Sequence, residues 1–128
     1  MLDHVALHVS DFARSRAFYL SALAAMGYVP RKTFYTDMGF GPGEVDEADD
    51  PGGEFWIHEG TPSTPRVHVA FRARSRAEVD AFHRAALAAG GRDNGAPGLR
   101  PQYHANYYGA FILDPDGYNV EAVCHRPA

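Results

Sequence analysis

Two short stretches of the chain alternate apolar and polar residues, and each is followed by a longer segment with helical periodicity. The alternating apolar positions are Val5, Leu7 and Val9 in the first stretch, and Val67, Val69 and Phe71 in the second. A period of two is typical of a strand with one buried face, whereas a period near 3.6 indicates an amphipathic helix. The pattern therefore predicts a strand and then a helix, twice, with each helix ending at a glycine.

The two copies resemble each other in sequence as well as in pattern. Residues 4–27 align with residues 68–91 without a gap, and the alignment pairs His4 with His68, Phe18 with Phe82, and Gly27 with Gly91. Each strand is followed by residues that cap helices well, Ser10 or Asp11 in the first copy and Ser75 in the second. An internal duplication of one supersecondary unit accounts for both observations.

Shorter apolar stretches after each helix predict three further strands in each copy. They lie at about 28–36, 37–41 and 54–59, and then near 92–95, 107–114 and 118–125. The order is βαβββ twice, which makes this an α+β protein. We expect one domain over residues 1–128, with a first module at about 1–60, a proline-containing linker at 61–65 and a second module at about 66–126.

Composition narrows the range of functions. The net charge of -4 argues against nucleic-acid binding, which needs a concentrated basic surface. No apolar run is long enough to cross a membrane, so we expect no membrane partner. The first residues lack the pattern of a signal peptide, and Cys124 is the single cysteine, so no intrachain disulfide can form. Both observations favour the cytoplasm, and a small molecule is the expected partner.

The strand pattern also predicts which side chains face away from the helices. They are His4, Ala6, His8, His68, Ala70 and Arg72 on the opening strands, and Trp56, His58, Asn119, Glu121 and Val123 on the closing strands. A carboxylate such as Glu121 is costly to bury among strand residues without a partner. Two histidines and one carboxylate from separate strands can form a facial set of ligands for a divalent metal, with positions left open for water or substrate.

The closing strands extend this argument. The segments EFWIHEG and GYNVEAV align with Phe55 over Tyr118 and His58 over Glu121. A pseudo-twofold axis between the modules would then bring the polar residues of both halves to one centre, namely His4, His58, His68 and Glu121.

At these positions the chain resembles the vicinal oxygen chelate superfamily, which includes glyoxalase I, bleomycin-resistance proteins and extradiol dioxygenases. The resemblance covers nearly the whole chain and rests on LDHVALHVSDFARSRAFY, RVHVAFRA and DPDGYNVEAV. It implies paired βαβββ modules whose sheets curve around a cleft, a homodimer, and His4, His68 and Glu121 as metal ligands. It also implies a reaction in which the metal chelates two neighbouring oxygens of the substrate.

His58 is a departure, because glyoxalase I has a metal-binding glutamate at that position. We expect His58 to act as a fourth ligand or as a hydrogen-bond partner of a ligand. Glu59 cannot replace the missing glutamate, since the next residue of a strand points to the opposite face. Without that base, isomerisation of a hemithioacetal is less expected than other lyase, isomerase or dioxygenase chemistry of the superfamily.

The segment at 98–111 is rich in aromatic residues and precedes a strand, so it can close over the cleft. We expect Tyr103 or His104 to transfer protons together with the catalytic carboxylate of Glu121. The predicted substrate pocket is completed by residues from both modules: His8, Trp56, Arg100, Tyr107 and Tyr108. Arg100 would meet an anionic group of the substrate.

Three functions remain open at this point. The favoured one is a metal-dependent enzyme in which the metal acts as a Lewis acid on adjacent oxygens. The second is ring-cleaving oxygenation on ferrous iron, and the third is metal-free binding of a small molecule, as in bleomycin-resistance proteins. Imidazole and carboxylate ligands suit zinc, iron, manganese, nickel and cobalt alike, so the sequence does not select the metal.

Overall fold

The computed structural model describes residues 1–44, 46 and 48–128 and confirms the order βαβββ twice. The first module comprises β1 (Val5–Val9), α1 (Phe12–Ala24), β2 (Tyr28–Thr33), β3 (Asp37–Pro42) and β4 (Phe55–Glu59). The second comprises β5 (His68–Arg72), α2 (Arg76–Ala88), β6 (Arg92–Leu99), β7 (Tyr108–Leu113) and β8 (Asn119–Cys124). Among the described residues, no helix is long and apolar enough to cross a membrane.

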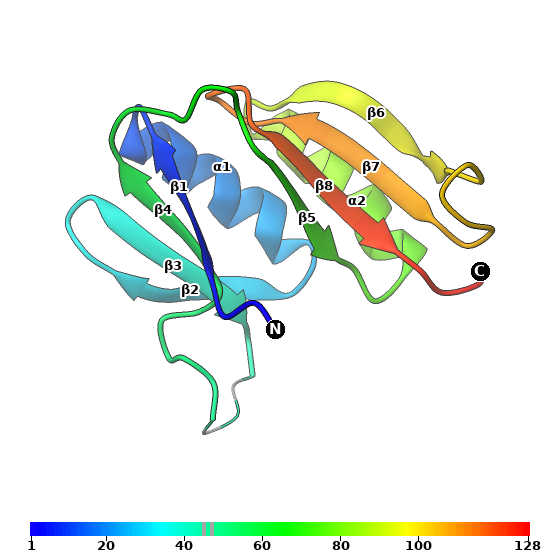
Figure 1. Ribbon diagram of the computed structural model, residues 1–128, viewed down its shortest axis with the longest axis horizontal. Coiled ribbons are helices and arrows are strands. Elements are labelled where there is room, and N and C mark those ends of the chain that lie inside the picture. Colours follow the sequence, from blue (N-terminus) through cyan, green and yellow to red (C-terminus); the bar gives the residue numbers. More distant parts are fainter. Residues whose placement is uncertain (45, 47) are drawn as a thin grey trace.

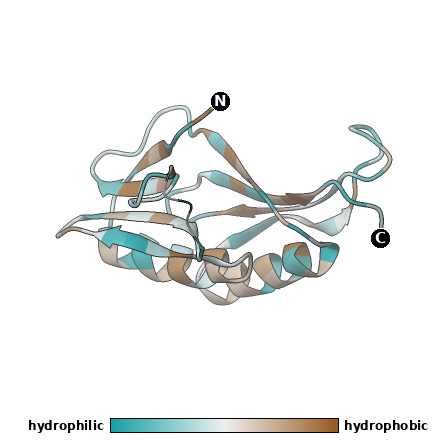
Figure 2. Cartoon of the chain, turned by 90° about the horizontal axis from the view of Figure 1, so that it is seen from below, coloured by the Kyte–Doolittle hydropathy of each residue, from teal (hydrophilic) through white to brown (hydrophobic). Residues whose placement is uncertain are grey.

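Each module forms its own four-stranded sheet. The strand orders are β1-β4-β3-β2 and β5-β8-β7-β6, and in each sheet the opening strand lies parallel to the closing strand. Figure 1 shows the two sheets side by side, with β1 and β5 running in opposite directions. Both helices cover the same side of the sheets, so the other side is free of helices (Figure 2).

The helices begin where the sequence predicts and pack through the predicted positions. Asp11 caps α1 by accepting a hydrogen bond from the backbone N–H of Arg14, and Ser75 caps α2 in the same way. Phe18 on α1 and Phe82 on α2 are fully buried. Burying a phenylalanine side chain contributes about 2 to 3 kcal/mol, so these matched residues anchor each helix to its sheet.

The strand β6 extends beyond the predicted end near residue 95 and reaches Leu99. Its pairing with β7 shifts between Asp93 and Gly95 and again between Gly95 and Gly98. These irregularities, together with the position of β6 at the edge of its sheet, let the strand continue past Pro97, which cannot donate a backbone hydrogen bond.

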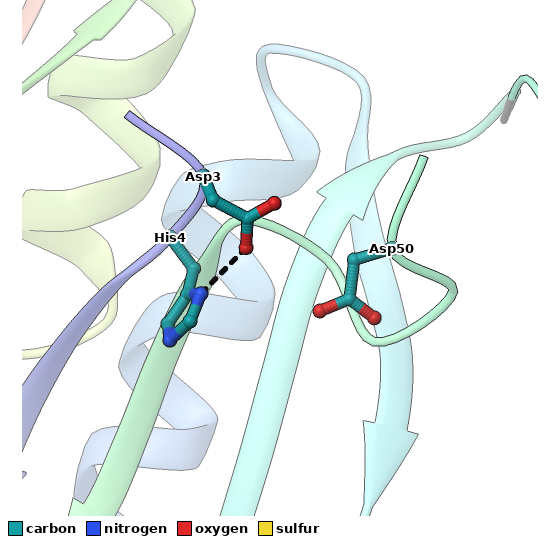
Figure 3. A group of neighbouring side chains, drawn as sticks. All are labelled: Asp3, His4 and Asp50. Carbon is teal, nitrogen blue, oxygen red and sulfur yellow. Dashed lines mark hydrogen bonds and ion pairs between the residues drawn. The ribbon is translucent and has the colours of Figure 1, made fainter. Parts of the chain in front are cut away.

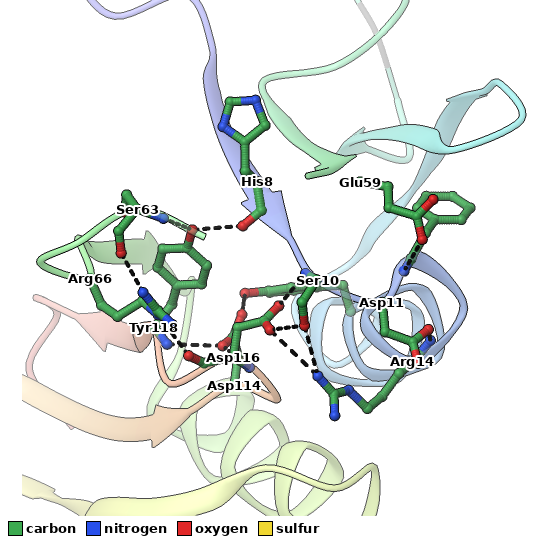
Figure 4. Close-up of polar contacts among 12 residues, drawn as sticks. His8, Ser10, Asp11, Arg14, Glu59, Ser63, Arg66, Asp114, Asp116 and Tyr118 are labelled. Atoms are coloured by element: carbon green, nitrogen blue, oxygen red, sulfur yellow. Dashed lines mark hydrogen bonds and ion pairs between the residues drawn. The ribbon is translucent and has the colours of Figure 1, made fainter. Parts of the chain in front are cut away.

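A buried polar joint fixes one module against the other (Figure 4). Asp114, only 2% exposed, accepts a hydrogen bond from the hydroxyl of Tyr19 at 2.5 Å and two more from backbone N–H groups. The Tyr118 hydroxyl donates to the carbonyl oxygen of His8 at 2.7 Å and accepts from the backbone N–H of Ser63. The turn before β8 is therefore held to α1, β1 and the linker.

Candidate functional site

A carboxylate, an imidazole and a phenol meet on the open face of the second sheet. Glu121 lies in the middle of β8, and its exposed fraction is only 2%. His68 begins β5, the neighbouring parallel strand, and its Nε2 lies 2.9 Å from Glu121 Oε1. The hydroxyl of Tyr107, just before β7, donates a hydrogen bond to Glu121 Oε2. Three chain segments thus converge on one buried carboxylate.

The contacts of His68 indicate the tautomer of its neutral ring, that is, which ring nitrogen carries the hydrogen. Its Nδ1 lies 2.9 Å from the carbonyl oxygen of Asn119, which can only accept, so Nδ1 carries a hydrogen. In the neutral imidazole, Nε2 then has a lone pair directed at Glu121 Oε1. Two acceptors at 2.9 Å repel each other unless a proton or a cation lies between them.

Tyr107 remains a hydrogen-bond donor at this site. Burial raises the pKa of Tyr107, and the neighbouring carboxylate of Glu121 raises it further. The phenol is therefore protonated at neutral pH and holds one oxygen of Glu121, while the other oxygen faces His68.

A hollow of about 440 Å³ lies beside this cluster. It is lined by His68, Tyr103, His104, Tyr107, Phe111, Asn119 and Glu121. Tyr103 is 61% exposed, and its ring centroid lies 4.8 Å from that of Tyr107. Both residues expected to transfer protons, Tyr103 and His104, thus line the hollow that contains Glu121, although neither is hydrogen-bonded to it within the described residues.

The third expected ligand, His4, lies apart from His68 and Glu121 in the single chain. Its Nδ1 is 2.6 Å from an oxygen of Asp3, and one ligand atom each from His4, Asp3 and Asp50 lie within 4.8 Å of one another (Figure 3). Because β1 and β5 run in opposite directions in neighbouring sheets, their first residues lie at opposite ends of the pair (Figure 1). Within one chain, the expected convergence of His4 with the other two ligands therefore does not occur.

His58 belongs to a separate group on the open face of the first sheet. Its Nδ1 donates to Asp37 at 2.8 Å, and its ring stacks beside Trp56 with centroids 5.9 Å apart and planes 7° apart. The ring of His8 lies 6.1 Å from that of His58, and the ring of Phe34 also stacks with Trp56, with centroids 6.2 Å apart. His8 and Trp56, which were predicted to line the substrate pocket, thus form an aromatic cluster with His58 on the first sheet, whereas Glu121 lies on the second sheet.

The strand register corrects the alignment of the two closing strands. Ala6 lies opposite Trp56 in the first sheet, and its counterpart Ala70 lies opposite Glu121 in the second. The first-module equivalent of Glu121 is therefore Trp56 rather than His58. The alignment on Phe55 and Tyr118 placed the strands two residues out, because it ignored their pairing with the opening strands.

Two residues expected in the substrate pocket are directed elsewhere. The hydroxyl of Tyr108 donates to Asp80 on α2 at 2.7 Å, since neighbouring residues at the start of a strand point to opposite faces. The guanidinium of Arg100 donates to the carbonyl oxygens of Ala96 and Gly98 and lies over the ring of Phe111. Tyr108 thus contacts α2 instead of the hollow, and Arg100 stabilises β6.

Several residues of the site were not found from the sequence. Phe111 and Asn119 line the hollow. The strand pattern placed Asn119 on this face but gave it no role, because it contacts His68 through its backbone carbonyl oxygen, which no side-chain pattern can indicate. Phe111 lies two residues after Gly109 on β7 and therefore on the same face, and this period of two was the available signal. Asp37 also escaped notice, because its contact with His58 depends on the pairing of β3 with β4.

Comparison with known proteins supports the interpretation of the fold. The sequence model described as the Glyoxalase/Bleomycin resistance protein/Dioxygenase superfamily matches residues 1–122. A comparison with curated proteins gives no match.

Solved structures with the same fold span nearly the whole chain. A glyoxalase/bleomycin resistance protein from Albidiferax ferrireducens T118 is 29% identical, with a TM-score of 0.78 and 99% of both chains covered. A glyoxalase-related enzyme from Fulvimarina pelagi is 18% identical, with a TM-score of 0.70 over 97% of this chain and 87% of that one. A family enzyme from Burkholderia phytofirmans PsJN is also 18% identical, with a TM-score of 0.70 over 97% and 98%.

Proposed function

Since the chain belongs to the Glyoxalase/Bleomycin resistance protein/Dioxygenase superfamily, we propose that it is a metal-dependent enzyme acting on a small molecule with two adjacent oxygens. His68 and Glu121 of one subunit, together with His4 of a second subunit in a homodimer, would hold the metal. Assembly across two chains is part of the proposal because His4 lies apart from the other two ligands within one chain.

The observation that carries the proposal is the contact between two potential metal ligands, His68 Nε2 and Glu121 Oε1, whose atoms lie 2.9 Å apart on neighbouring strands. A metal-binding histidine is usually oriented by donating its other ring N–H to a backbone carbonyl or a carboxylate, and His68 Nδ1 donates to the carbonyl oxygen of Asn119. His4 has the same arrangement, with Nδ1 donating to Asp3, and its Nε2 has no hydrogen-bond partner among the described residues. The donor set of two imidazoles and one carboxylate fits zinc, iron, manganese, nickel or cobalt.

A metal at this position would act as a Lewis acid on the substrate oxygens. The chain's own residues would orient the substrate and manage protons. Tyr107 fixes Glu121 through Oε2, which leaves Oε1 as the oxygen on the side of His68. Tyr103 borders the same hollow, where it would donate or accept a proton. His104 borders it as well, but its two ring nitrogens are hydrogen-bonded to Asn106 and His125, so Tyr103 is the better candidate. Phe111 provides an apolar wall.

Metal analysis of protein purified without chelators tests the ligands. We expect a stoichiometric metal in the wild type and a loss of most of it in His68→Ala and Glu121→Ala. His83→Ala is the matched control, because His83 bonds to Asp93 instead of to the site. Unchanged metal content in both ligand variants would refute the assignment.

Mixed dimers test whether the site is shared between subunits. A heterodimer of His4→Ala with Glu121→Ala contains one site with both substitutions and one with none if the ligands come from two chains. We therefore expect about half of the wild-type metal in that heterodimer and little in either parent homodimer. If both parent homodimers lose the metal and the heterodimer also contains little, every site is built within one chain.

Metal-free binding of a small molecule is the second candidate. It is favoured by the fact that both oxygens of Glu121 already have partners in His68 and Tyr107, provided that His68 is protonated. The first module has Trp56 at the position equivalent to Glu121, so this position offers an aromatic surface for a ligand instead of a carboxylate for a metal. Wild-type protein that contains no stoichiometric metal and takes up none of the five metals would favour this candidate.

A further inference from the structure

We propose that this protein has an anion-binding site, separate from the Glu121 cluster, that takes a phosphate or carboxylate group. The site is a hollow of about 390 Å³ between the turn that leads into α2 and the segment that follows β8. It is lined by Arg72, Ala73, Arg74, His125 and Arg126.

The strand topology explains why these cations gather. The parallel strands β5 and β8 end side by side, with Arg72 paired in register with Val123 and the backbone N–H of Ala73 donating to the carbonyl oxygen of Val123 at 2.8 Å. Arg72 is the last residue of β5 and Arg74 follows two residues later, whereas Arg126 lies two residues after the end of β8. Residues far apart in the sequence therefore present three guanidinium groups to one place.

The charge of the hollow contrasts with that of the whole chain, whose net charge is -4. No carboxylate lines it in the part of the chain that the structure describes. Glu78 is nearby and pairs with Arg74 at 3.1 Å, which leaves two guanidinium groups uncompensated. The guanidinium groups of Arg72 and Arg126 form no hydrogen bond or ion pair with any described residue.

The fourth group, His125, has a hydrogen on the nitrogen available for binding. His104 Nδ1 accepts a hydrogen bond from the backbone N–H of Asn106, so the neutral ring of His104 carries its hydrogen on Nε2. That Nε2 donates to His125 Nδ1 at 2.8 Å. His125 must then carry its own hydrogen on Nε2, which is outside this bond and free to donate.

Guanidinium groups recognise phosphate and carboxylate groups because their planar N–H donors match a pair of anionic oxygens. All four polar side chains here are exposed, so solvent and salt weaken each contact. We therefore expect dissociation constants of the order of millimolar, and a stronger affinity for dianionic phosphate than for a monocarboxylate, since the charge of the anion is twice as large.

Titration of isotope-labelled protein with inorganic phosphate, acetate and chloride at constant ionic strength, followed by NMR, tests the proposal. We expect saturable shifts at Arg72, Arg126 and His125 with phosphate, and a dissociation constant at least ten times larger in the double variant Arg72→Gln, Arg126→Gln. Arg84→Gln is the control, because Arg84 is an exposed arginine of α2 that does not line the hollow.

The comparison of anions separates the ligand classes. Saturation by phosphate alone assigns a phosphate site, and saturation by phosphate and acetate assigns a site for either group. Equal shifts with chloride, or equal weakening in Arg84→Gln and in the double variant, would overturn the proposal. Circular dichroism of each variant verifies that the fold is retained.

Discussion

Replacing Tyr19 by phenylalanine tests the buried joint between the modules. The ring of Tyr19 is fully buried, and its hydroxyl donates to Asp114 at 2.5 Å. Burial and the carboxylate of Asp114 raise the pKa of Tyr19, so the group stays a donor. The substitution keeps the ring contacts and removes one of three hydrogen bonds to a carboxylate that is only 2% exposed.

A hydrogen bond to a charged group contributes about 1.5 to 3 kcal/mol, and we expect a loss in this range. With a denaturant slope of about 2 kcal/mol per molar urea, the unfolding midpoint at pH 7 should fall by roughly 1 M. Tyr28→Phe is the matched control. It also removes a hydroxyl bonded to a carboxylate, Glu54, but that carboxylate is exposed, so the loss should stay below about 1 kcal/mol.

The cost of Tyr19→Phe should also depend on pH. Burial raises the pKa of Asp114 in the folded protein, and the bond from Tyr19 opposes that rise. A carboxyl group with a raised folded pKa stabilises the fold most at low pH, and this stability is lost as the pH rises through the folded pKa. The phenylalanine variant raises that pKa further, so its cost should be smaller near pH 4 than at pH 7. Equal costs at both values, or a loss no larger than in Tyr28→Phe, would refute the reasoning.

Three further predictions concern stability. Gly39→Ala would place a Cβ against the carbonyl oxygen of Gly52 and 2.6 Å from the indole of Trp56, so we expect a loss of about 1 to 3 kcal/mol in urea unfolding. Gly43→Ala, whose Cβ has its nearest neighbour at 3.7 Å, should lose little. Ser75→Ala removes the cap of α2 and should cost about 1 kcal/mol by thermal unfolding; an unchanged midpoint would contradict the role of the cap. Asp114→Asn cannot ionise and should flatten the decline of stability with rising pH above about 4, and a decline as steep as in the wild type would assign the effect to another group.

Local periodicity was sufficient to predict the fold and one half of the candidate site. Alternation along β8 and β5 placed Glu121 and His68 on the face away from the helices, and the structure brings them to 2.9 Å. The duplicated pattern also predicted both helix caps, because a cap depends on residues next to one another in the chain.

What the sequence could not reveal depends on long-range geometry. The opposite directions of β1 and β5 separate His4 from Glu121, and no local pattern encodes the direction in which one sheet lies beside another. Tyr107 and Tyr108 point to opposite faces because they are neighbours at the start of β7, but the sequence does not mark where that strand begins, so the prediction assigned both to the pocket. Asp37 and Asn119 reach the histidines through strand pairing, which becomes visible only when the strands are assembled.

Trp56 occupies the position in the first module that Glu121 occupies in the second, and glycines lie against its indole. Gly39 and Gly52 lie so close to the ring that a methyl group on either would approach it to 2.6 Å, and the indole N–H donates to the carbonyl oxygen of Gly53. A glutamate at position 56 would leave part of the space of the indole unfilled. The two modules thus differ at equivalent positions, and exchanging Trp56 for the acid of the second module would require changes in its neighbours as well.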